Sequence, residues 1–109
     1  MLAKQFLLQE KLQINYILRK GSHTVTDLFT IKYIASDKLQ FCIVISKKLA
    51  AKAVDRNHLK RQISESIRLH LDKIKNTHQV VIIPKKHILK ASYQDIEQNS
   101  LNLISFLNK

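Results

Sequence analysis

The chain has 109 residues and a mass of 12.7 kDa, so we expect one domain that covers residues 1–109. It carries 19 Lys and Arg against 8 Asp and Glu, a net charge of +11, which indicates a polyanionic partner: nucleic acid or, alternatively, an anionic membrane surface. The single cysteine, Cys42, excludes an intrachain disulfide. Apolar runs too short for a membrane helix and an N-terminus without a signal-peptide pattern predict a cytoplasmic protein.

The first half of the chain predicts one helix and two strands. Apolar residues at spacings of three, four and seven predict a helix over residues 6–19, with Gly21 as its C-cap. Residues 28–34 alternate in character, as in a strand with one buried face. The β-branched run over residues 39–45 predicts a second, more buried strand, and residues 46–54 could add a short third one.

The second half predicts two helices and a strand between them. Asp55 is a candidate N-cap for a helix that continues to about Ile74. At 100° per residue, one side of this helix is apolar and contains Leu59, Ile63, Ile67, His70, Leu71 and Ile74. Residues 80–83 predict a strand that ends at Pro84, and a Ser92–Asp95 capping box opens the last helix. The order of elements predicts a small sheet with helices packed on it.

Positive charge is concentrated between Ser46 and Arg68. Only Asp55 and Glu65 oppose the cations there, which are Lys47, Lys48, Lys52, Arg56, Lys60, Arg61 and Arg68. Such a helix face and its preceding loop can bind phosphates, and the Asn57 amide can bond a base edge or a ribose hydroxyl. The alternative is a solvated face whose aliphatic stems cover the core. The scarcity of acids favours nucleic acid.

The same stretch resembles the signature of the bacterial ribonuclease P protein family. The resemblance rests on Ser46-Lys47-Lys48, Ala53-Val54 and Arg56-Asn57-x-x-Lys60-Arg61, and it extends over nearly the whole chain. It implies an α+β fold, a single-domain α/β sandwich with the order α-β-β-β-α-β-α, a small mixed sheet and a left-handed βαβ crossover. It also implies an accessory subunit of ribonuclease P, in which the RNA subunit holds the catalytic magnesium ions and the protein helps to bind the 5′ leader of precursor tRNA.

The resemblance assigns expected roles to individual residues. Contacts with the catalytic RNA would come from Arg56, Asn57, Lys60, Arg61 and Arg68, with Lys47, Lys48 and Lys52 at the edge of that surface. A leader cleft between the first helix and the sheet would contain Ile14, Leu18 and Lys32. No protein residue would be catalytic or hold a metal. The expected partners are the catalytic RNA and precursor tRNA, without DNA or membrane.

The sequence departs from the family pattern at several positions. His58 stands in place of an arginine, Ser64 replaces a residue that is commonly basic, the loop 49–52 lacks the usual glycine, and the cleft positions lose aromatic side chains.

Three other functions are open to a sequence of this kind. The first is a ribosomal or other structural RNA-binding protein, against which the motif spacing argues. The second is a membrane-bound basic helix, against which the need to cover a sheet argues. The third is a nuclease with His58 as general base, although the five histidines show no paired metal-ligand spacing.

Overall fold

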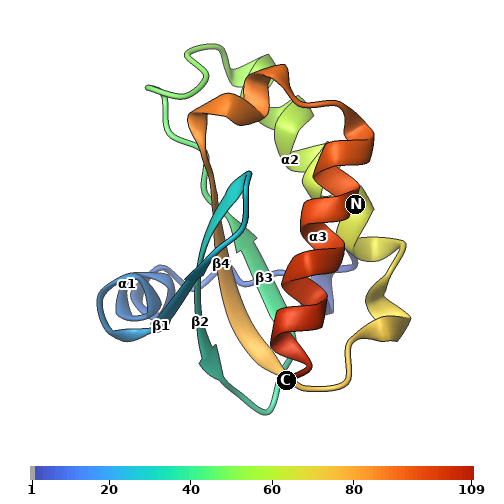
Figure 1. Ribbon diagram of the computed structural model, residues 1–109. Helices are drawn as coiled ribbons and strands as arrows, with labels where there is room; N and C mark the ends of the chain where they lie inside the picture. The colour runs from blue at the N-terminus through green and yellow to red at the C-terminus, as the bar shows by residue number, and fades with distance from the viewer. Residues whose placement is uncertain (1) are drawn as a thin grey trace.

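The computed structural model describes residues 2–109, which form a sheet covered by helices on both faces (Figure 1). Its helices are α1 (Lys11–Lys20), α2 (Ala53–Arg68) and α3 (Tyr93–Leu107). Its strands are β1 (Ser22–Val25), β2 (Phe29–Ala35), β3 (Gln40–Ile43) and β4 (His78–Pro84). Helix α1 lies on one face of the sheet, and α2 and α3 lie side by side on the other. The predicted α+β sandwich and its order α-β-β-β-α-β-α are confirmed.

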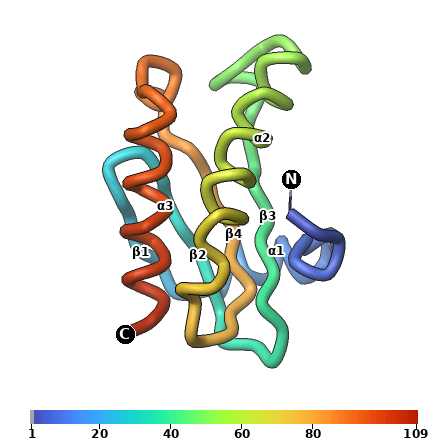
Figure 2. Tube along the Cα trace, turned by 90° about the vertical axis from the view of Figure 1, so that its right-hand side faces the viewer, coloured from blue at the N-terminus to red at the C-terminus, as the bar shows by residue number. Residues whose placement is uncertain are grey.

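The sheet is mixed and has the strand order β1-β2-β4-β3. Strand β2 is antiparallel to both β1 and β4, whereas β3 is parallel to β4, with Phe41 opposite Val80. Helix α2 connects the two parallel strands. In Figure 2 both strands run upward behind α2 and β4 lies to the left of β3, so the crossover is left-handed. This is the rare hand for a βαβ connection.

Alternation along the strands divides the apolar residues between two clusters. The larger cluster lies between the sheet and the α2–α3 layer; its fully buried members include Phe29, Ile31, Phe41, Ile63, Val80, Ile82 and Leu103. The smaller cluster lies under α1 and is built on Leu8, Ile17 and Val81. Each sheet face is therefore a packed surface, and α1 is held by its own small core.

Helix α1 begins at Lys11, five residues later than residue 6, where the hydrophobic spacing placed its start. The preceding residues join the sheet instead, since Leu7 forms a parallel bridge with Phe41 and the Leu8 N–H donates to the Phe41 carbonyl at 2.9 Å. Pairing with the edge of β3 overrides the local helical pattern. At the other end, a Cβ on Gly21 would lie 2.6 Å from the Ile17 carbonyl oxygen, so this close approach requires glycine.

The third strand precedes the other two, and the expectation of a strand in residues 46–54 is wrong. Residues 46–50 form a turn in which the Leu49 and Ala50 N–H groups donate to the Ser46 carbonyl, and Ala53 and Val54 already belong to α2. The additional strand is β1, which follows Gly21 directly. Its sequence Ser-His-Thr-Val has no apolar alternation because β1 is an edge strand that is mostly exposed.

Helix α2 is displaced toward the N-terminus relative to its prediction. Lys52 occupies the N-cap position without a side-chain cap, so Asp55 is not the N-cap; it lies in the first turn, where its charge complements the helix dipole. The helix ends at Arg68 rather than near Ile74, and a short 3₁₀ helix follows at Leu71–Lys73.

The predicted capping box of α3 is confirmed. The Asp95 N–H donates to Ser92 Oγ and the Ser92 N–H donates to the Asp95 carboxylate, each at 3.1 Å.

We expect Asn99→Ala to lower the free energy of unfolding by about 1–3 kcal/mol, measured by urea denaturation. The Asn99 amide oxygen accepts from the buried Leu28 N–H at 2.9 Å and its amide nitrogen donates to the Asp95 carbonyl at 2.8 Å. Truncation leaves the Leu28 N–H buried without a partner. Asn102→Ala is the control, because Asn102 is exposed on the same helix. Equal effects of the two substitutions would contradict this account.

Candidate RNA-binding surface

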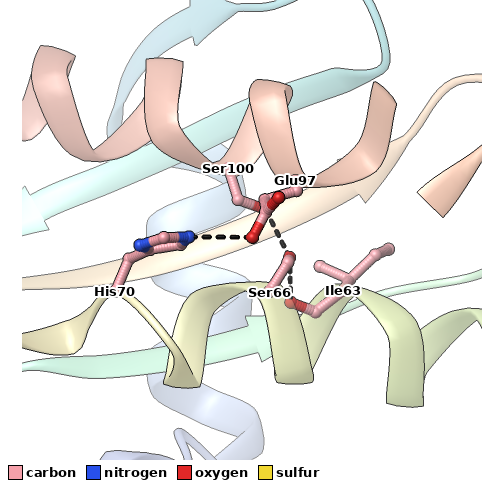
Figure 3. Close-up of polar contacts among 5 residues, drawn as sticks. All are labelled: Ile63, Ser66, His70, Glu97 and Ser100. Carbon is pink, nitrogen blue, oxygen red and sulfur yellow. Dashed lines mark hydrogen bonds and ion pairs between the residues drawn. The ribbon is translucent and has the colours of Figure 1, made fainter. Parts of the chain in front are cut away.

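One side of α2 is fixed against the sheet and α3. Leu59, Ile63 and Ile67 are buried on this side. Figure 3 shows the polar contacts beside them: the Ser66 hydroxyl donates to the Ile63 carbonyl and is bonded to the Ser100 hydroxyl, both at 2.7 Å. One turn further, His70 Nε2 lies 3.0 Å from the Glu97 carboxylate. These contacts join α2 to α3, so the opposite side of α2 is held outward.

The outward side of α2 carries the cations of the sequence motif. Asn57, Arg61 and Arg68 are exposed, at spacings of four and seven that place them on one side of the helix. Lys60 is half-buried beside them. Lys47, Lys48 and Lys52 are exposed in the segment that leads into α2. We call this set the basic surface: Lys47, Lys48, Lys52, Arg56, Asn57, Lys60, Arg61 and Arg68.

Within the basic surface, Arg56 also bonds to the backbone of the turn before α2. One nitrogen of its guanidinium group donates to the Ala50 carbonyl at 2.9 Å and to the Ala51 carbonyl at 2.8 Å. These bonds hold the turn that carries Lys47 and Lys48 against the start of α2. The sequence motif gave no sign of this contact, because the partners are backbone atoms of a loop with no predictable conformation.

Arg68 is paired within α2. Its Nε donates to Glu65 Oε2 at 3.0 Å and its Nη2 to the other carboxylate oxygen, so the pair is bidentate. The hydrogen bond from Arg68 lowers the pKa of Glu65 to about 2. The carboxylate is therefore charged at neutral pH, and a phosphate that approaches Arg68 meets a guanidinium group that already has an anionic neighbour.

Ser64 and Lys60 lie where the basic surface meets the N-terminal segment. Ser64 is 3% exposed, so the position that is commonly basic in the family is buried here. Ser64 and Lys60 line a small hollow together with Leu8 and Cys42. Burial raises the pKa of the Cys42 thiol, and the nearby Lys60 ammonium group acts in the opposite direction. Lys60 thus lies between the outward side of α2 and the N-terminal segment that pairs with β3.

The predicted cleft residues are brought together between α1 and the sheet. Ile14 and Leu18 are half-buried and pack against the cluster of Leu8, Ile17 and Val81. The Lys32 ammonium group, on β2, donates to the Leu18 carbonyl at 2.7 Å. A cation at the C-terminal end of a helix is electrostatically favourable, so Lys32 ties α1 to the sheet. Sequence reasoning missed this contact.

Three glutamine side chains form a second hydrogen-bonded connection between α1 and the sheet. Gln13 on α1 donates to Gln79 on β4 at 2.7 Å, and Gln79 donates to Gln40 on β3 at 2.9 Å. Together with the Lys32 contact, it fixes α1 to the sheet at two separate points.

The potential metal-ligating side chains of residues 2–109 are scattered over the fold. No three His, Cys, Asp or Glu side chains in this range are grouped so that they could hold a metal ion. His58, the candidate general base, is exposed on α2 beside a hollow that Asp55 and Gln62 also line. None of the helices in this range is both long and apolar enough to span a membrane.

Comparisons with known proteins give one consistent family. The family model described as Ribonuclease P matches residues 2–108. The ribonuclease P protein component of Alkaliphilus metalliredigens is 31% identical over 100 residues, 89% of this chain and 88% of that protein. The component of Clostridium acetobutylicum is 33% identical over 106 residues, 94% of this chain and 88% of that protein.

Two solved structures share the fold. The RNase P protein of Thermotoga maritima superposes with a TM-score of 0.80 at 23% identity, covering 90% of this chain and 94% of that one. The Staphylococcus aureus RNase P protein gives a TM-score of 0.80 at 22% identity, covering 97% of each chain. The match of the family model over nearly every residue, with the fold that the motif implied, establishes that the chain belongs to the ribonuclease P protein family, which serves in the maturation of tRNA 5′ ends.

Proposed function

We propose that this protein binds the catalytic RNA subunit of ribonuclease P through the basic surface and assists it in removing the 5′ leader of precursor tRNA. The observation that carries the proposal is the exposed set of cations on α2 and its preceding turn, held outward by the packing of α2 on the sheet and α3. The protein acts as one RNA-binding domain in the cytoplasm, with no role for DNA or a membrane.

Phosphate recognition suits the geometry of this surface. Arg61 is exposed and can present its guanidinium fork to a phosphate, and the exposed Asn57 lies one turn away, where its amide can bond a ribose or a base edge. Lys47, Lys48 and Lys52 add flexible point charges along the approach to α2. Backbone contacts of this kind supply affinity, and the shape of the folded RNA supplies selectivity.

The leader is assigned to the side of the sheet that α1 covers. Ile14 and Leu18 offer aliphatic surface and Lys32 offers a cation, but the ammonium group of Lys32 is already bonded to the Leu18 carbonyl. Aromatic stacking contributes about 1–3 kcal/mol per base. A cleft with aliphatic side chains at these positions therefore binds leader bases more weakly than a cleft with aromatic ones.

The proposal places the chemical step in the RNA subunit. Among residues 2–109, no three His, Cys, Asp or Glu side chains are grouped as they would be at a metal site built by protein alone, which supports this division. In the holoenzyme the catalytic magnesium would be bound by RNA, and the side chains of this protein would contribute binding and charge neutralisation.

Co-purification of the tagged protein tests the proposal most directly. The expected result is one stoichiometric structured RNA, which cleaves precursor tRNA at the 5′ end of the mature sequence when it is recombined with the protein. Recovery of ribosomal RNA or ribosomal particles instead would favour a structural RNA-binding protein and overturn the proposal.

The logarithm of the affinity for the catalytic RNA should fall linearly with the logarithm of the salt concentration. The slope should be about −0.7 to −0.9 for each phosphate that the protein neutralises. Arg61→Ala should weaken binding and make this slope less steep by the contribution of about one phosphate contact. Filter binding at several salt concentrations measures both quantities. A flat salt dependence for the wild-type protein would mean that the basic surface is only solvated.

Arg56→Ala should lower stability as well as RNA affinity, because it removes two hydrogen bonds that hold the turn before α2. We expect a loss of about 1–2 kcal/mol in the free energy of unfolding and faster amide exchange in residues 46–52. Arg61→Ala, at an exposed position of the same helix, should change stability by less than about 0.5 kcal/mol. Unchanged exchange in the turn of Arg56→Ala would refute this division of roles.

The protein alone should not cleave precursor tRNA, and His58→Ala should leave the cleavage step of the reconstituted holoenzyme nearly unchanged. The reason is that the His58 side chain is exposed and belongs to no group of three potential metal ligands among residues 2–109. Single-turnover rates at saturating protein provide the measurement. A loss of about 100-fold, the scale of general acid–base catalysis, with intact folding would identify His58 as a catalytic residue.

A further inference from the structure

A hollow of about 460 Å³ lies where the start of α2 meets the segment between β4 and α3. This segment contains a short 3₁₀ helix, Lys86–Lys90, and both views show it at the same end of the molecule as the start of α2 (Figure 1, Figure 2). The volume lies within the range of small-ligand sites, roughly 300–1,000 Å³. The apolar part of its wall includes Ala50, Leu59 and Leu89, and the polar part consists of Asp55, His58 and Gln62.

The polar part of the wall is a column of side chains on α2 that the basic surface does not include. Asp55, His58 and Gln62 follow one another at spacings of three and four, so they lie on one side of the helix. At about 100° per residue, this column is rotated by roughly a third of a turn from Asn57 and Arg61. The hollow therefore uses a different side of α2 from the one that presents the cations.

The three polar side chains are available to a ligand. None of them is hydrogen-bonded to another group within residues 2–109. The Asp55 carboxylate can only accept hydrogen bonds, the Gln62 amide donates and accepts, and the His58 ring does either according to its tautomer. Beside them, Leu59 is 7% exposed and Leu89 is 51% exposed, so the wall offers apolar surface as well. This combination suits a flat ring that has a polar edge.

Hydrogen bonds hold both walls of the hollow in place. On one wall, the Arg56 guanidinium group donates to the Ala50 carbonyl at 2.9 Å and to the Ala51 carbonyl at 2.8 Å. On the other, Ile88 is 1% exposed and its N–H donates to the Lys85 carbonyl at 3.0 Å. Because the walls are ordered before a ligand arrives, binding does not have to order them.

Cations stand at both rims of the hollow. Lys52 is exposed directly after Ala51, and Lys86 and Lys90 are exposed beside Leu89. A ring that enters the hollow would therefore have its attached phosphate close to positive charge. A nucleotide combines such a ring with such a phosphate, and unpaired bases are the groups that RNA presents for sequence-specific recognition.

We propose that this hollow binds one unpaired base of the catalytic RNA, with the ring against Leu89 and the polar edge hydrogen-bonded to Gln62 and Asp55. The inference rests on the proposed function and deepens it, since the basic surface contacts phosphates whereas the hollow reads a base. Because the Asp55 carboxylate only accepts hydrogen bonds, it favours a base with an exocyclic amino group: adenine, cytosine or guanine rather than uracil.

Salt dependence distinguishes this site from the phosphate contacts. Gln62→Ala and Leu89→Ala should each weaken binding of the catalytic RNA about two- to tenfold, the range that the loss of one net hydrogen bond or of a comparable apolar contact covers. The slope of log affinity against log salt should keep its wild-type value, because neither substitution removes a charge.

Matched controls lie outside the hollow. Leu69→Ala makes the same change at a leucine that is 49% exposed, and Gln94→Ala removes an exposed amide of α3. Both controls should bind the catalytic RNA as the wild-type protein does. Thermal melting of each variant checks that the fold is intact.

Reagents that modify the Watson–Crick edges of unpaired bases identify the nucleotide. At saturating protein, the wild type and Leu69→Ala should protect one unpaired base of the catalytic RNA that becomes reactive in Gln62→Ala and Leu89→Ala. An abasic substitution at that nucleotide should weaken binding of the wild-type protein and abolish the difference between wild type and Gln62→Ala. Unchanged affinity in both hollow variants, or the absence of a base whose protection depends on them, would overturn the proposal.

Failure of the proposed function has a different signature. In that case the wild-type protein would not assemble with the catalytic RNA, and it would protect no base. Normal assembly that is weakened by Arg61→Ala but indifferent to Gln62→Ala and Leu89→Ala rejects the base site alone.

Discussion

The burial of one side of α2 is the constraint on which the presentation of charge in this protein depends. Leu59, Ile63 and Ile67 pack into the core between the sheet and α3, and the serine pair Ser66 and Ser100 fixes the contact between the two helices. A helix can point a row of cations at a partner only if its opposite side is held. Because repulsion among like charges destabilises the folded state, the apolar contacts of α2 must offset it as long as no polyanion neutralises the surface.

The cations of α2 differ in how freely they can meet a phosphate. Arg61 is exposed, whereas Arg56 already bonds two loop carbonyls and Arg68 already pairs with Glu65. The neighbouring helix α3 contains two acids and no Lys or Arg, so the two helices of one layer differ sharply in charge. This asymmetry orients an approaching polyanion toward α2 and its preceding turn, which is a steering effect on association.

Elements whose determinants lie close together in the sequence could be predicted. The prediction failed where contacts with residues far along the chain determine the local structure. The Ser92–Asp95 capping box and the apolar side of α2 were predictable because their partners lie within a few residues. The start of α1 was not, because Leu7 and Leu8 pair with Phe41 across the fold. Among the candidate site residues, Arg61 is exposed, as its place in the motif predicted. The bonds of Arg56 and Lys32 go to backbone carbonyls, which a sequence pattern cannot name.

The left-handed crossover determines which face of the sheet receives α2. With the strand order β1-β2-β4-β3, a right-handed connection from β3 to β4 would place α2 on the face that α1 covers. The left-handed connection places it beside α3, where the Ser66–Ser100 and His70–Glu97 contacts become available. It also leaves the opposite face to α1 alone, whose 10 residues span only about 15 Å. The hand of this single connection therefore separates the basic surface, on one side of the sheet, from the proposed leader cleft of Ile14, Leu18 and Lys32, which lies under α1 on the other side.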